Sequence, residues 1–462
     1  LEALEQFRES GVKLLITIDL GITAVAEVAQ AEVNGLDVII TDHHLPRVDA
    51  SQGGSTSLVL PRAYAILNPK VDDPAKDGAS YPEKMLCGAG VIFKFAQGFI
   101  KKYGEYFKIK NGAEKWMLDM AGLATLSDMV PLTGENRALA HFGMKVLRKS
   151  RRPGLQKLLA KMNIDQRYLS EDDIVFMVSP RLNAASRMDS PYRAYELLAT
   201  ENEAQAGELA NHLSKINDER KNIVTQIMRE VHKKLEKREQ REVIVLGNPD
   251  WRVGVLGLVA GKILDQHDRP VFVWGKDEND CIKGSCRSDG SVSVVELMTT
   301  ARESFIDFGG HELAGGFTVA SEKIHFLEET LCVSYAKVKR SKENNDLGHD
   351  INADLSAVSM KNWREIEKLA PFGLGNPKPV FCFDGAKIEK IKKFGKNGSG
   401  EHMEIIFSDT GEKKIPAIAF FSGHESFSTP LEEGKRVKLL ATFDLSRFRG
   451  REELRLRVTD IL

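Results

Sequence analysis

One carboxylate and two imidazoles stand in direct succession at Asp42, His43 and His44. The continuous apolar run that precedes them predicts a short parallel strand buried on both faces. A second apolar, β-rich run, residues 12–18, also ends in an acid, Asp19. Carboxylates and imidazoles together suit Mn²⁺, Mg²⁺ or Zn²⁺. The pattern therefore predicts metal or phosphate chemistry at the ends of two strands.

The residues between these two acids predict how the acids come together. Apolar side chains recur at helical spacing over residues 22–34, and Gly35 then ends the pattern. A strand, helix, strand unit joins parallel strands by a right-handed crossover, so both carboxyl ends lie at one edge of the sheet. We therefore expect Asp19 to meet the Asp42 triplet in space. For Asp19 taken alone, a role as the cap of the following helix stays open.

Composition limits the class of protein. The chain has 462 residues, of which 42% are hydrophobic, and its net charge is −1. This predicts several globular domains and no global field for nucleic acid, so any such site must be a local patch. The five cysteines form no CxxC pair, which argues against a disulfide framework or zinc ribbon and predicts a cytoplasmic protein. No apolar run approaches the length of a membrane span, and no signal peptide is recognisable.

The order of patterns predicts a modular α/β protein. We expect an α/β domain with a parallel sheet over residues 1–190 and a long connecting helix with a solvated charged face over 191–239. A second α/β domain is predicted over residues 240–343. Short, evenly spaced strands over 350–462 predict a small β-barrel. Because the chain begins at Leu1 inside a helical pattern, we also expect further residues upstream.

A third acid, Asp128, lies between an apolar helix and the turn at Val130 and Pro131. It is either a helix cap or another inward-pointing ligand, and spacing alone does not decide between them. The glycine-rich helix start at Gly88 and Gly90 is likewise open to two interpretations, an anion site or close helix packing.

Two further regions carry residue types that bind phosphate. Residues 180–188 place arginines and an asparagine among small residues, although a surface salt-bridge loop is the alternative. In the second domain, a strand with hydroxyl and cationic groups and glycine pairs around one histidine predict a second phosphate-binding wall. The candidate phosphate ligands are Arg181, Asn183, Arg187, Ser285, Arg287, Ser288, Gly309, Gly310 and His311.

Basic and aromatic residues gather in the predicted barrel. Such pairs line grooves that hold single-stranded nucleic acid, although ordinary surface lysines remain the alternative for any one of them. These residues are Lys387, Lys390, Lys392, Lys393, Phe394, Lys396, Arg447, Phe448 and Arg449.

Six motifs, in this order, resemble those of the DHH phosphoesterase family, and most closely its bacterial single-stranded-DNA exonucleases. The Asp42-His43-His44 triplet is the motif that names the family. The other five are Ile18 to Ile22 (Asp-x-Gly), Ser127 to Leu132, Pro180 to Met188 (with Ser186 at the last glycine of Arg-x-Asn-Ala-Ala-Gly-Arg), Gly309 to His311, and Leu369 to Pro379 (Pro-Phe-Gly-x-Gly-Asn-Pro).

The resemblance implies a DHH domain and a DHH-associated domain that face each other across a cleft, joined by the long helix, with an OB-like barrel that guides the strand. It also implies two divalent ions, Mn²⁺ or Mg²⁺, that hold an activated water and polarise the scissile phosphate. Carried onto this sequence, the catalytic residues are Asp19, Asp42, His43, His44 and Asp128. Asp19, Asp42, His43 and Asp128 are the expected metal ligands, with Asp19 bridging the ions, and Asp42 and His44 are either ligands or supporting groups beside them.

The implied function is a 5′-to-3′ single-stranded-DNA exonuclease of DNA repair and recombination. By the same resemblance, single-strand-binding protein and a helicase are expected partners. The family also carries an upstream Asp-x-Asp motif that this sequence lacks, so we expect the chain alone to hold one metal poorly and to be a weak or inactive nuclease.

Two other functions stay open. The first is a DHH phosphodiesterase of short oligonucleotides or cyclic dinucleotides, against which the barrel argues because small substrates need no strand guide. The second is a non-catalytic nucleic-acid-binding fragment, which the missing motif keeps possible.

Overall fold

The computed structural model describes residues 2–49, 57–72, 80–239, 241–340, 348–395, 402–409, 413–420, 422–423, 426–447 and 451–462. The chain divides into two compact units. The first comprises residues 1–150, 166–175 and 346–462, and the second comprises 151–165 and 176–345. Within the described residues, no helix is both long and apolar enough to cross a membrane.

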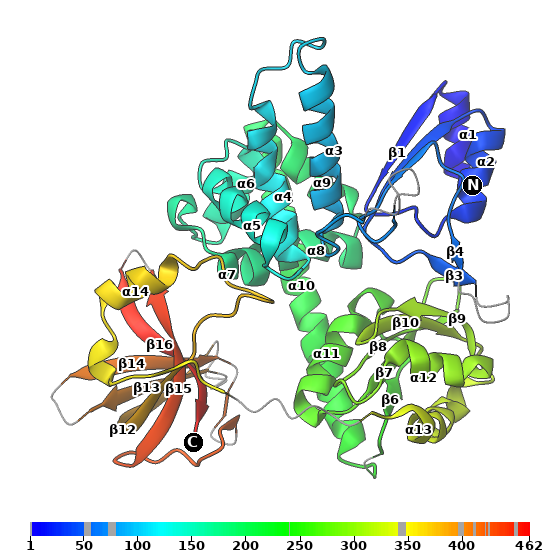
Figure 1. Cartoon of the computed structure of the whole chain (residues 1–462). Coiled ribbons are helices and arrows are strands. Elements are labelled where there is room, and N and C mark those ends of the chain that lie inside the picture. Colours follow the sequence, from blue (N-terminus) through cyan, green and yellow to red (C-terminus); the bar gives the residue numbers. More distant parts are fainter. Residues whose placement is uncertain are drawn as a thin grey trace. The chain divides into compact units, whose positions relative to one another are not determined.

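A three-stranded parallel sheet opens the first unit. β2 (Asp37–Thr41) lies between β1 (Leu14–Ile18) and β5 (Ala65–Leu67). Helices α1 (Glu2–Glu9) and α2 (Val25–Val33) cover one face, as Figure 1 shows, and bury a core with the sheet. The predicted strand, helix, strand unit is confirmed.

The two strands that precede the acids differ in burial. Val38 and Ile40 of β2 are 3% and 0% exposed, as expected for the central strand. β1 lies at the edge of the sheet, and its side chains Leu14, Ile16 and Ile18 are 48%, 37% and 50% exposed. Burial on both faces therefore describes β2 and not β1.

Helices α3 (Gly88–Tyr103), α4 (Leu118–Ser127) and α5 (Gly134–Leu147) follow the sheet. Two glycines let α4 and α5 approach closely, because a Cβ added at Gly122 would lie 2.6 Å from the Cα of Gly143. The short elements of this unit are β3 (Arg47–Asp49), β4 (Ser57–Val59) and α7 (Glu171–Asp173).

The C-terminal part of the first unit is a closed β-barrel, which confirms the predicted one. Its strands are β12 (Phe381–Phe394), β13 (His402–Ser408), β14 (Lys414–Phe420), β15 (Arg436–Ser446) and β16 (Glu453–Ile461), and pairing of β12 with β15 closes it. β11 (Ile351–Asn352) and α14 (Met360–Glu367) precede the barrel. Of the predicted strand-binding residues, Lys396, Phe448 and Arg449 lie outside the described residues.

The second unit contains a five-stranded mixed sheet in the order β6-β7-β8-β10-β9. Only β6 and β7 pair in parallel among its described pairings. Its strands are β6 (Ile244–Gly247), β7 (Val271–Lys276), β8 (Ile282–Arg287), β9 (Phe305–Gly310) and β10 (Ala314–Val319). The helices packed with it are α11 (Leu256–His267), α12 (Val294–Thr300) and α13 (Leu327–Val338).

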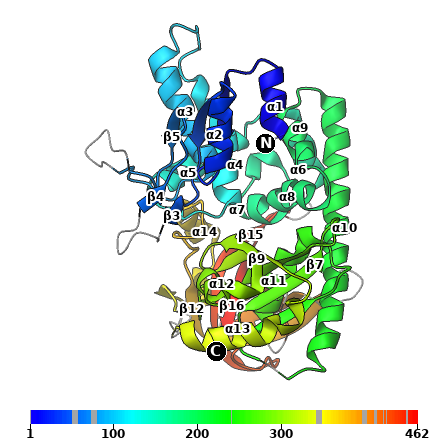
Figure 2. The ribbon, with the colours of Figure 1, turned by 90° about the vertical axis from the view of Figure 1, so that its right-hand side faces the viewer.

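The long helical pattern of residues 191–239 forms two helices. α9 (Tyr192–Ala199) ends before Asn202, whose side chain accepts hydrogen bonds from the backbone N–H groups of Ala204 and Gln205 and caps α10 (Glu203–Leu235). Figure 2 shows α10 along its length. Its apolar stripe packs on the neighbouring helices α6 (Pro153–Lys161) and α8 (Ser179–Met188).

Candidate metal centre and phosphate-binding residues

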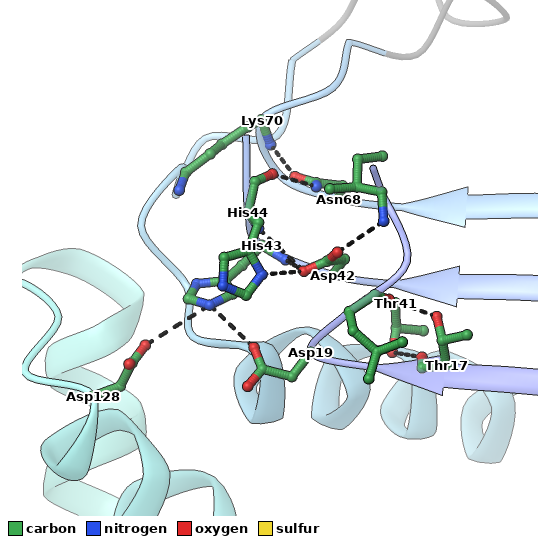
Figure 3. A network of polar contacts seen from close by, with 11 residues as sticks. Thr17, Asp19, Thr41, Asp42, His43, His44, Asn68, Lys70 and Asp128 are labelled. Carbon is green, nitrogen blue, oxygen red and sulfur yellow. Dashed lines mark hydrogen bonds and ion pairs between the residues drawn. The ribbon is translucent and has the colours of Figure 1, made fainter. Parts of the chain in front are cut away.

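Asp19 leaves β1 in a strained backbone conformation. Its φ is +67°, in the left-handed region, and its N–H donates to the Thr41 carbonyl at 2.9 Å. The Thr17 hydroxyl holds the same loop by donating to the Leu20 carbonyl at 2.7 Å (Figure 3). Aspartate adopts this region more readily than most residues, and such conformations recur at active sites. The backbone thus fixes where the Asp19 carboxylate lies.

The glycine that begins α3 lies directly against Asp19. A Cβ added at Gly88 would lie 2.2 Å from Oδ1 of Asp19. The Asp19 carboxylate therefore lies beside the amino end of α3, whose positive end favours an anion. Gly88 serves close packing here, and the anion that it admits is a side chain of the same chain.

Asp42 lies beneath the surface, where its carboxylate is only 1% exposed. Oδ2 accepts from the Ile22 N–H at 2.9 Å, and Oδ1 accepts from the His43 N–H and from Nδ1 of His44, each at 2.7 Å. Burial alone would raise the pKa of Asp42, but these hydrogen bonds outweigh it and lower the pKa. Both oxygens of Asp42 already accept from the chain, which favours a supporting role beside the metal over direct ligation.

His44 is oriented by Asp42. Since the ionised carboxylate can only accept, Nδ1 of His44 must donate, which leaves the lone pair of Nε2 available to a metal. The carbonyl of His44 accepts from Nδ2 of Asn68 at 2.9 Å. Metal-binding histidines are commonly oriented in this way, with one ring nitrogen donating to a carboxylate and the other left open for the metal.

His43 points toward two carboxylates from other elements. Its Nε2 lies 3.1 Å from Oδ1 of Asp19 and 3.9 Å from Oδ2 of Asp128 (Figure 3). The hydrogen bond to Asp19 raises the pKa of His43, burial opposes this, and the charge of Asp128 adds to the rise. Ligand atoms of Asp19, His43 and His44 all lie within 4.8 Å of one another. The predicted convergence of Asp19 with the triplet is present.

Asp128 combines the two features that the sequence left open, a helix end and a side chain directed at the other candidate residues. Its N–H donates to the Ala124 carbonyl at 2.9 Å and ends α4, while its side chain points at His43. Burial raises the pKa of Asp128, and the nearby negative charge of Asp19 raises it further. Because these carboxylates repel each other, a divalent cation between them would relieve that repulsion.

Sequence reasoning missed two residues at the end of the third strand. Lys70 is half-buried, and burial lowers its pKa while the charges of Asp128 and Asp42 oppose that shift. Its N–H donates to Oδ1 of Asn68 at 2.9 Å. Both residues follow β5, so the strand-end rule that selected Asp19 and the triplet applies to them too.

These donors fit a hard divalent cation. Carboxylate oxygens and imidazole nitrogens are the ligands that Mn²⁺ accepts, and oxygen-rich sites also suit Mg²⁺. Asp19, His43, His44 and Asp128 present such atoms, and Asp42 orients the His44 ring through Nδ1.

The first predicted phosphate-binding stretch is a helix rather than a loop. It forms most of α8, where Arg181 and Arg187 are half-buried and Asn183 is exposed. Arg181 donates to the Met177 carbonyl at 2.8 Å, and Arg187 donates to the Gly254 carbonyl at 3.3 Å. Hydrogen bonds to backbone carbonyls thus hold both arginine side chains in place.

The second stretch brings Ser285 and Arg287 together on β8. Arg287 donates to the Ser285 hydroxyl at 3.1 Å, and that hydroxyl donates to the Gly315 carbonyl at 3.2 Å. Gly257 leaves room for the Arg287 side chain, because a Cβ added at Gly257 would lie 3.0 Å from Nη2 of Arg287. Burial lowers the pKa of Arg187, and the charge of Arg287 lowers it further.

The other predicted members of this wall have different surroundings. Ser288 is 5% exposed, and its hydroxyl donates to the Val292 carbonyl within its own loop. Gly309 and Gly310 pair with Gly316 and Gly315 in the β9–β10 hairpin, and exposed His311 begins its turn. Ser288 is therefore a structural residue of the loop, while the glycines place His311.

A fourth arginine comes from α10, which the sequence indicated only as a connector. Burial lowers the pKa of Arg220, and the positive charges of Arg187 and Arg181 lower it further. Asn217, one turn earlier, is 0% exposed. Nε of Arg220 and both amide atoms of Asn217 are buried without a hydrogen-bond partner among the described residues. The sequence pattern that could have identified these two residues is their i, i+3 spacing on the buried apolar stripe of α10.

Three family models match the chain. The DHH family N-terminal domain matches residues 2–125, the DHHA1 domain matches 240–332, and the RecJ OB domain matches 349–460.

Curated relatives match over nearly the whole chain. The single-stranded-DNA-specific exonuclease RecJ of Bacillus subtilis is 30% identical over 99% of this chain, which spans 55% of that protein. RecJ of Salmonella typhimurium is 30% identical over 100% of this chain and 79% of its own length. The chain thus spans about half to four fifths of the length of these two relatives.

A solved structure also matches the full chain. The crystal structure of RecJ from Thermus thermophilus in complex with Mn²⁺ aligns with a TM-score of 0.80 at 26% identity. The match covers 100% of this chain and 63% of that one.

Proposed function

The chain belongs to the RecJ family of single-stranded-DNA-specific exonucleases, and from this we propose that the protein hydrolyses single-stranded DNA with Mn²⁺ or Mg²⁺. The observation that carries this proposal is the convergence of Asp19, His43 and Asp128 from three separate elements. Removal of nucleotides from the 5′ end is part of the proposal and rests on the family resemblance.

Each residue of the centre has a task in this account. Asp19, His43 and Asp128 hold the divalent ion, and His44 offers Nε2 beside them. Asp42 keeps the His44 ring in the ligating tautomer. The bound ion would lower the pKa of a coordinated water and polarise the scissile phosphate. Lys70, whose charge interacts with those of Asp128 and Asp42, would balance negative charge that gathers at the phosphate.

Arginines of the second unit supply the grip on the strand. Arg181, Arg187, Arg220 and Arg287 are half-buried cations whose pKa values burial lowers. The charge of Arg287 lowers the pKa of Arg187 further, and the charges of Arg187 and Arg181 lower that of Arg220. Guanidinium groups bind phosphate bidentately, and binding an anion would offset their mutual repulsion. We propose that this arginine cluster, with Ser285, binds backbone phosphates of the substrate, and that His311 joins it from the hairpin.

The barrel supplies a surface suited to single-stranded nucleic acid. Three rings form a chain across β12, β13 and β14, because His402 lies 5.3 Å from Phe394 and 5.5 Å from Phe420 between centroids. Arg457 lies 5.4 Å above the Phe420 ring. Aromatic rings beside cations are what strand-binding grooves use to stack bases and hold phosphates. Phe420 and Arg457 extend the predicted set of lysines around Phe394.

Three finer points are proposed from the resemblance alone. Single-strand-binding protein and a helicase would bring the enzyme to its substrate in DNA repair and recombination. The cytoplasm, where bacterial DNA is processed, is the expected location.

A substrate comparison tests the proposed function. The natural protein is incubated with Mn²⁺ and 5′-labelled single-stranded DNA, the corresponding duplex, and a dinucleotide. We expect labelled mononucleotide from the single strand and little from the duplex. Cleavage of the dinucleotide but not the long strand would instead favour a small-nucleotide phosphodiesterase. Strand binding without turnover in the presence of bound metal would favour a binding protein.

A further inference from the structure

The segment that enters the barrel forms a self-closed loop over residues 369–377. Gly373 and Asn376 exchange backbone hydrogen bonds of 3.0 and 3.1 Å. The Asn376 side chain also donates to the carbonyls of Leu369 at 3.0 Å and Pro371 at 2.9 Å. Hydrogen bonds within the loop thus hold its conformation, apart from any contact with other elements.

This loop is bonded to the segment that follows Asp128. The Leu132 N–H donates to the Leu374 carbonyl at 2.6 Å. Farther along, on α5, Arg137 donates to the Leu369 carbonyl at 2.8 Å, so a second contact anchors the other end of the loop. Both contacts use backbone carbonyls of the loop, and they therefore depend on its fold rather than on its side chains.

Two glycines allow this close approach. Gly375 has φ of +74°, and an added Cβ would lie 3.2 Å from Cγ2 of Thr133 and 3.4 Å from Cβ of Pro131. A Cβ at Gly373 would lie 2.9 Å from Cδ1 of Leu132. The loop backbone therefore packs directly on the side chains of residues 131–133.

A second attachment fixes the loop from its other side. Phe372 is 6% exposed, and its N–H donates to Oε1 of Glu171 at 3.2 Å. Lys378, just beyond the loop, pairs with Asp172 at 3.0 Å. The loop is therefore held between α7 and the residues that follow α4.

Asp128 depends on its backbone for its position. Its side chain is 48% exposed, and Met129, which follows it, has φ of +53°. Only three residues separate Asp128 from Leu132, which the loop holds through its N–H. A shift of residues 131–133 would be transmitted through this short turn to the Asp128 carboxylate, 3.9 Å from Nε2 of His43.

We propose that the loop of residues 369–377 positions Asp128 for metal binding, so that the barrel entry is part of the support of the metal centre. Gly375 is then a positioning residue for the reaction. The inference rests on the proposed function only in taking Asp128 as a metal ligand. It accounts for a glycine-rich segment that barrel formation alone does not require.

Two left-handed glycines provide a matched test. Gly375 and Gly385 have φ of +74° and +71°, but a Cβ added at Gly385 meets no atom within 4 Å. Gly375→Ala and Gly385→Ala thus carry similar backbone strain, and only the first presses on the turn after Asp128. Mn²⁺ affinity is measured by calorimetry on the natural protein. We expect a loss of about tenfold or more for Gly375→Ala, the scale of supporting residues around metal sites, and wild-type affinity for Gly385→Ala.

A double-mutant cycle shows whether the effect passes through Asp128. In an Asp128→Asn background, Gly375→Ala should weaken Mn²⁺ binding no further, because the side chain that it displaces is already neutral. Additive losses, or equal affinities of the two alanine variants, would overturn the proposal. Asn376→Ala, which removes two hydrogen bonds within the loop, should reproduce the loss if Gly375→Ala fails to fold.

The outcomes for function and for positioning can be told apart. Should the natural protein bind Mn²⁺ and cleave no DNA, the proposed exonuclease activity fails, yet a selective loss in Gly375→Ala still supports the loop's role. If DNA is cleaved with the same Mn²⁺ dependence in wild type and Gly375→Ala, the function stands and the positioning role is refuted.

Discussion

At the scale of single residues, two adjacent histidines have different surroundings and different tasks. His43 faces the carboxylates of Asp19 and Asp128, whereas His44 donates to Asp42 and leaves Nε2 open. The difference arises because Asp42 lies 1% exposed beneath them and is already saturated with donors. Asp42, the acid of the triplet, is therefore proposed to orient His44 rather than to bind the metal itself.

Replacing Asp42 tests that assignment. In Asp42→Asn, a nitrogen that cannot accept a hydrogen bond replaces one of the two carboxylate oxygens. Either the Ile22 N–H or the Nδ1–H of His44 then loses its acceptor. We expect a loss of about 1–3 kcal/mol in the free energy of unfolding, the cost of one unsatisfied buried donor, and Mn²⁺ affinity about 10–100-fold weaker. Urea denaturation and calorimetry measure the two effects. Full Mn²⁺ affinity in this variant would show that His44 needs no orienting carboxylate.

The raised pKa of His43 predicts how metal binding depends on pH. A ligand nitrogen must lose its proton before it binds a metal, and Asp19 and Asp128 hold that proton more tightly than usual. Mn²⁺ affinity should therefore rise with pH through a range above the ordinary histidine pKa of about 6.5 and level off beyond it. Calorimetry at several pH values measures this rise. His43→Gln should weaken binding and flatten the dependence, and an unchanged slope would exclude His43 as the titrating ligand.

The candidate centre was partly visible in the sequence for reasons that apply to single strands. Asp19 and the triplet follow apolar runs, so the strand-end rule located them. Two facts escaped that rule: the burial of Asp42 and the arrival of Asp128 from α4. Both depend on contacts between residues distant in the sequence, which no local pattern encodes.

At the scale of elements, helices supply most of the arginines in the proposed phosphate-binding cluster. Residues 180–188 form a helix, and α10 adds Arg220 to the two arginines of α8. The sequence pattern of α10 predicts its apolar stripe and a solvated charged face. Asn217 and Arg220 differ from those charges because they lie along the stripe itself, where they are buried and half-buried.

Arg220 is expected to matter for strand binding. Arg220→Ala should weaken binding of single-stranded DNA about tenfold, since hydrogen bonds to charged groups contribute about 1.5–3 kcal/mol. The slope of log affinity against log salt should become shallower by about 0.7. Binding is measured by fluorescence anisotropy in EDTA, so that no cleavage occurs. Arg229→Ala, an exposed residue of the same helix, is the control. Equal affinity and slope in the two variants would remove Arg220 from the phosphate-binding cluster.

At the scale of the whole chain, the class of fold was predictable and the support of the site was not. Short apolar runs separated by glycine and polar turns indicated both α/β regions and all five barrel strands. The contact of residues 369–377 with the turn after Asp128 joins segments about 240 positions apart. Such a contact forms only when the barrel entry packs on the segment between α4 and α5, so composition and periodicity carry no trace of it.

The most direct test of the central claim is to measure Mn²⁺ binding and DNA cleavage together in one pair of variants. Asp19→Asn removes a proposed ligand, whereas Asp37→Asn changes an exposed acid at the opposite end of the neighbouring strand. We expect Asp19→Asn to lose Mn²⁺ affinity and release of mononucleotide from single-stranded DNA, while Asp37→Asn retains both. Retained cleavage in Asp19→Asn with unchanged Mn²⁺ affinity would contradict the proposed metal centre and place the metal chemistry elsewhere in the protein.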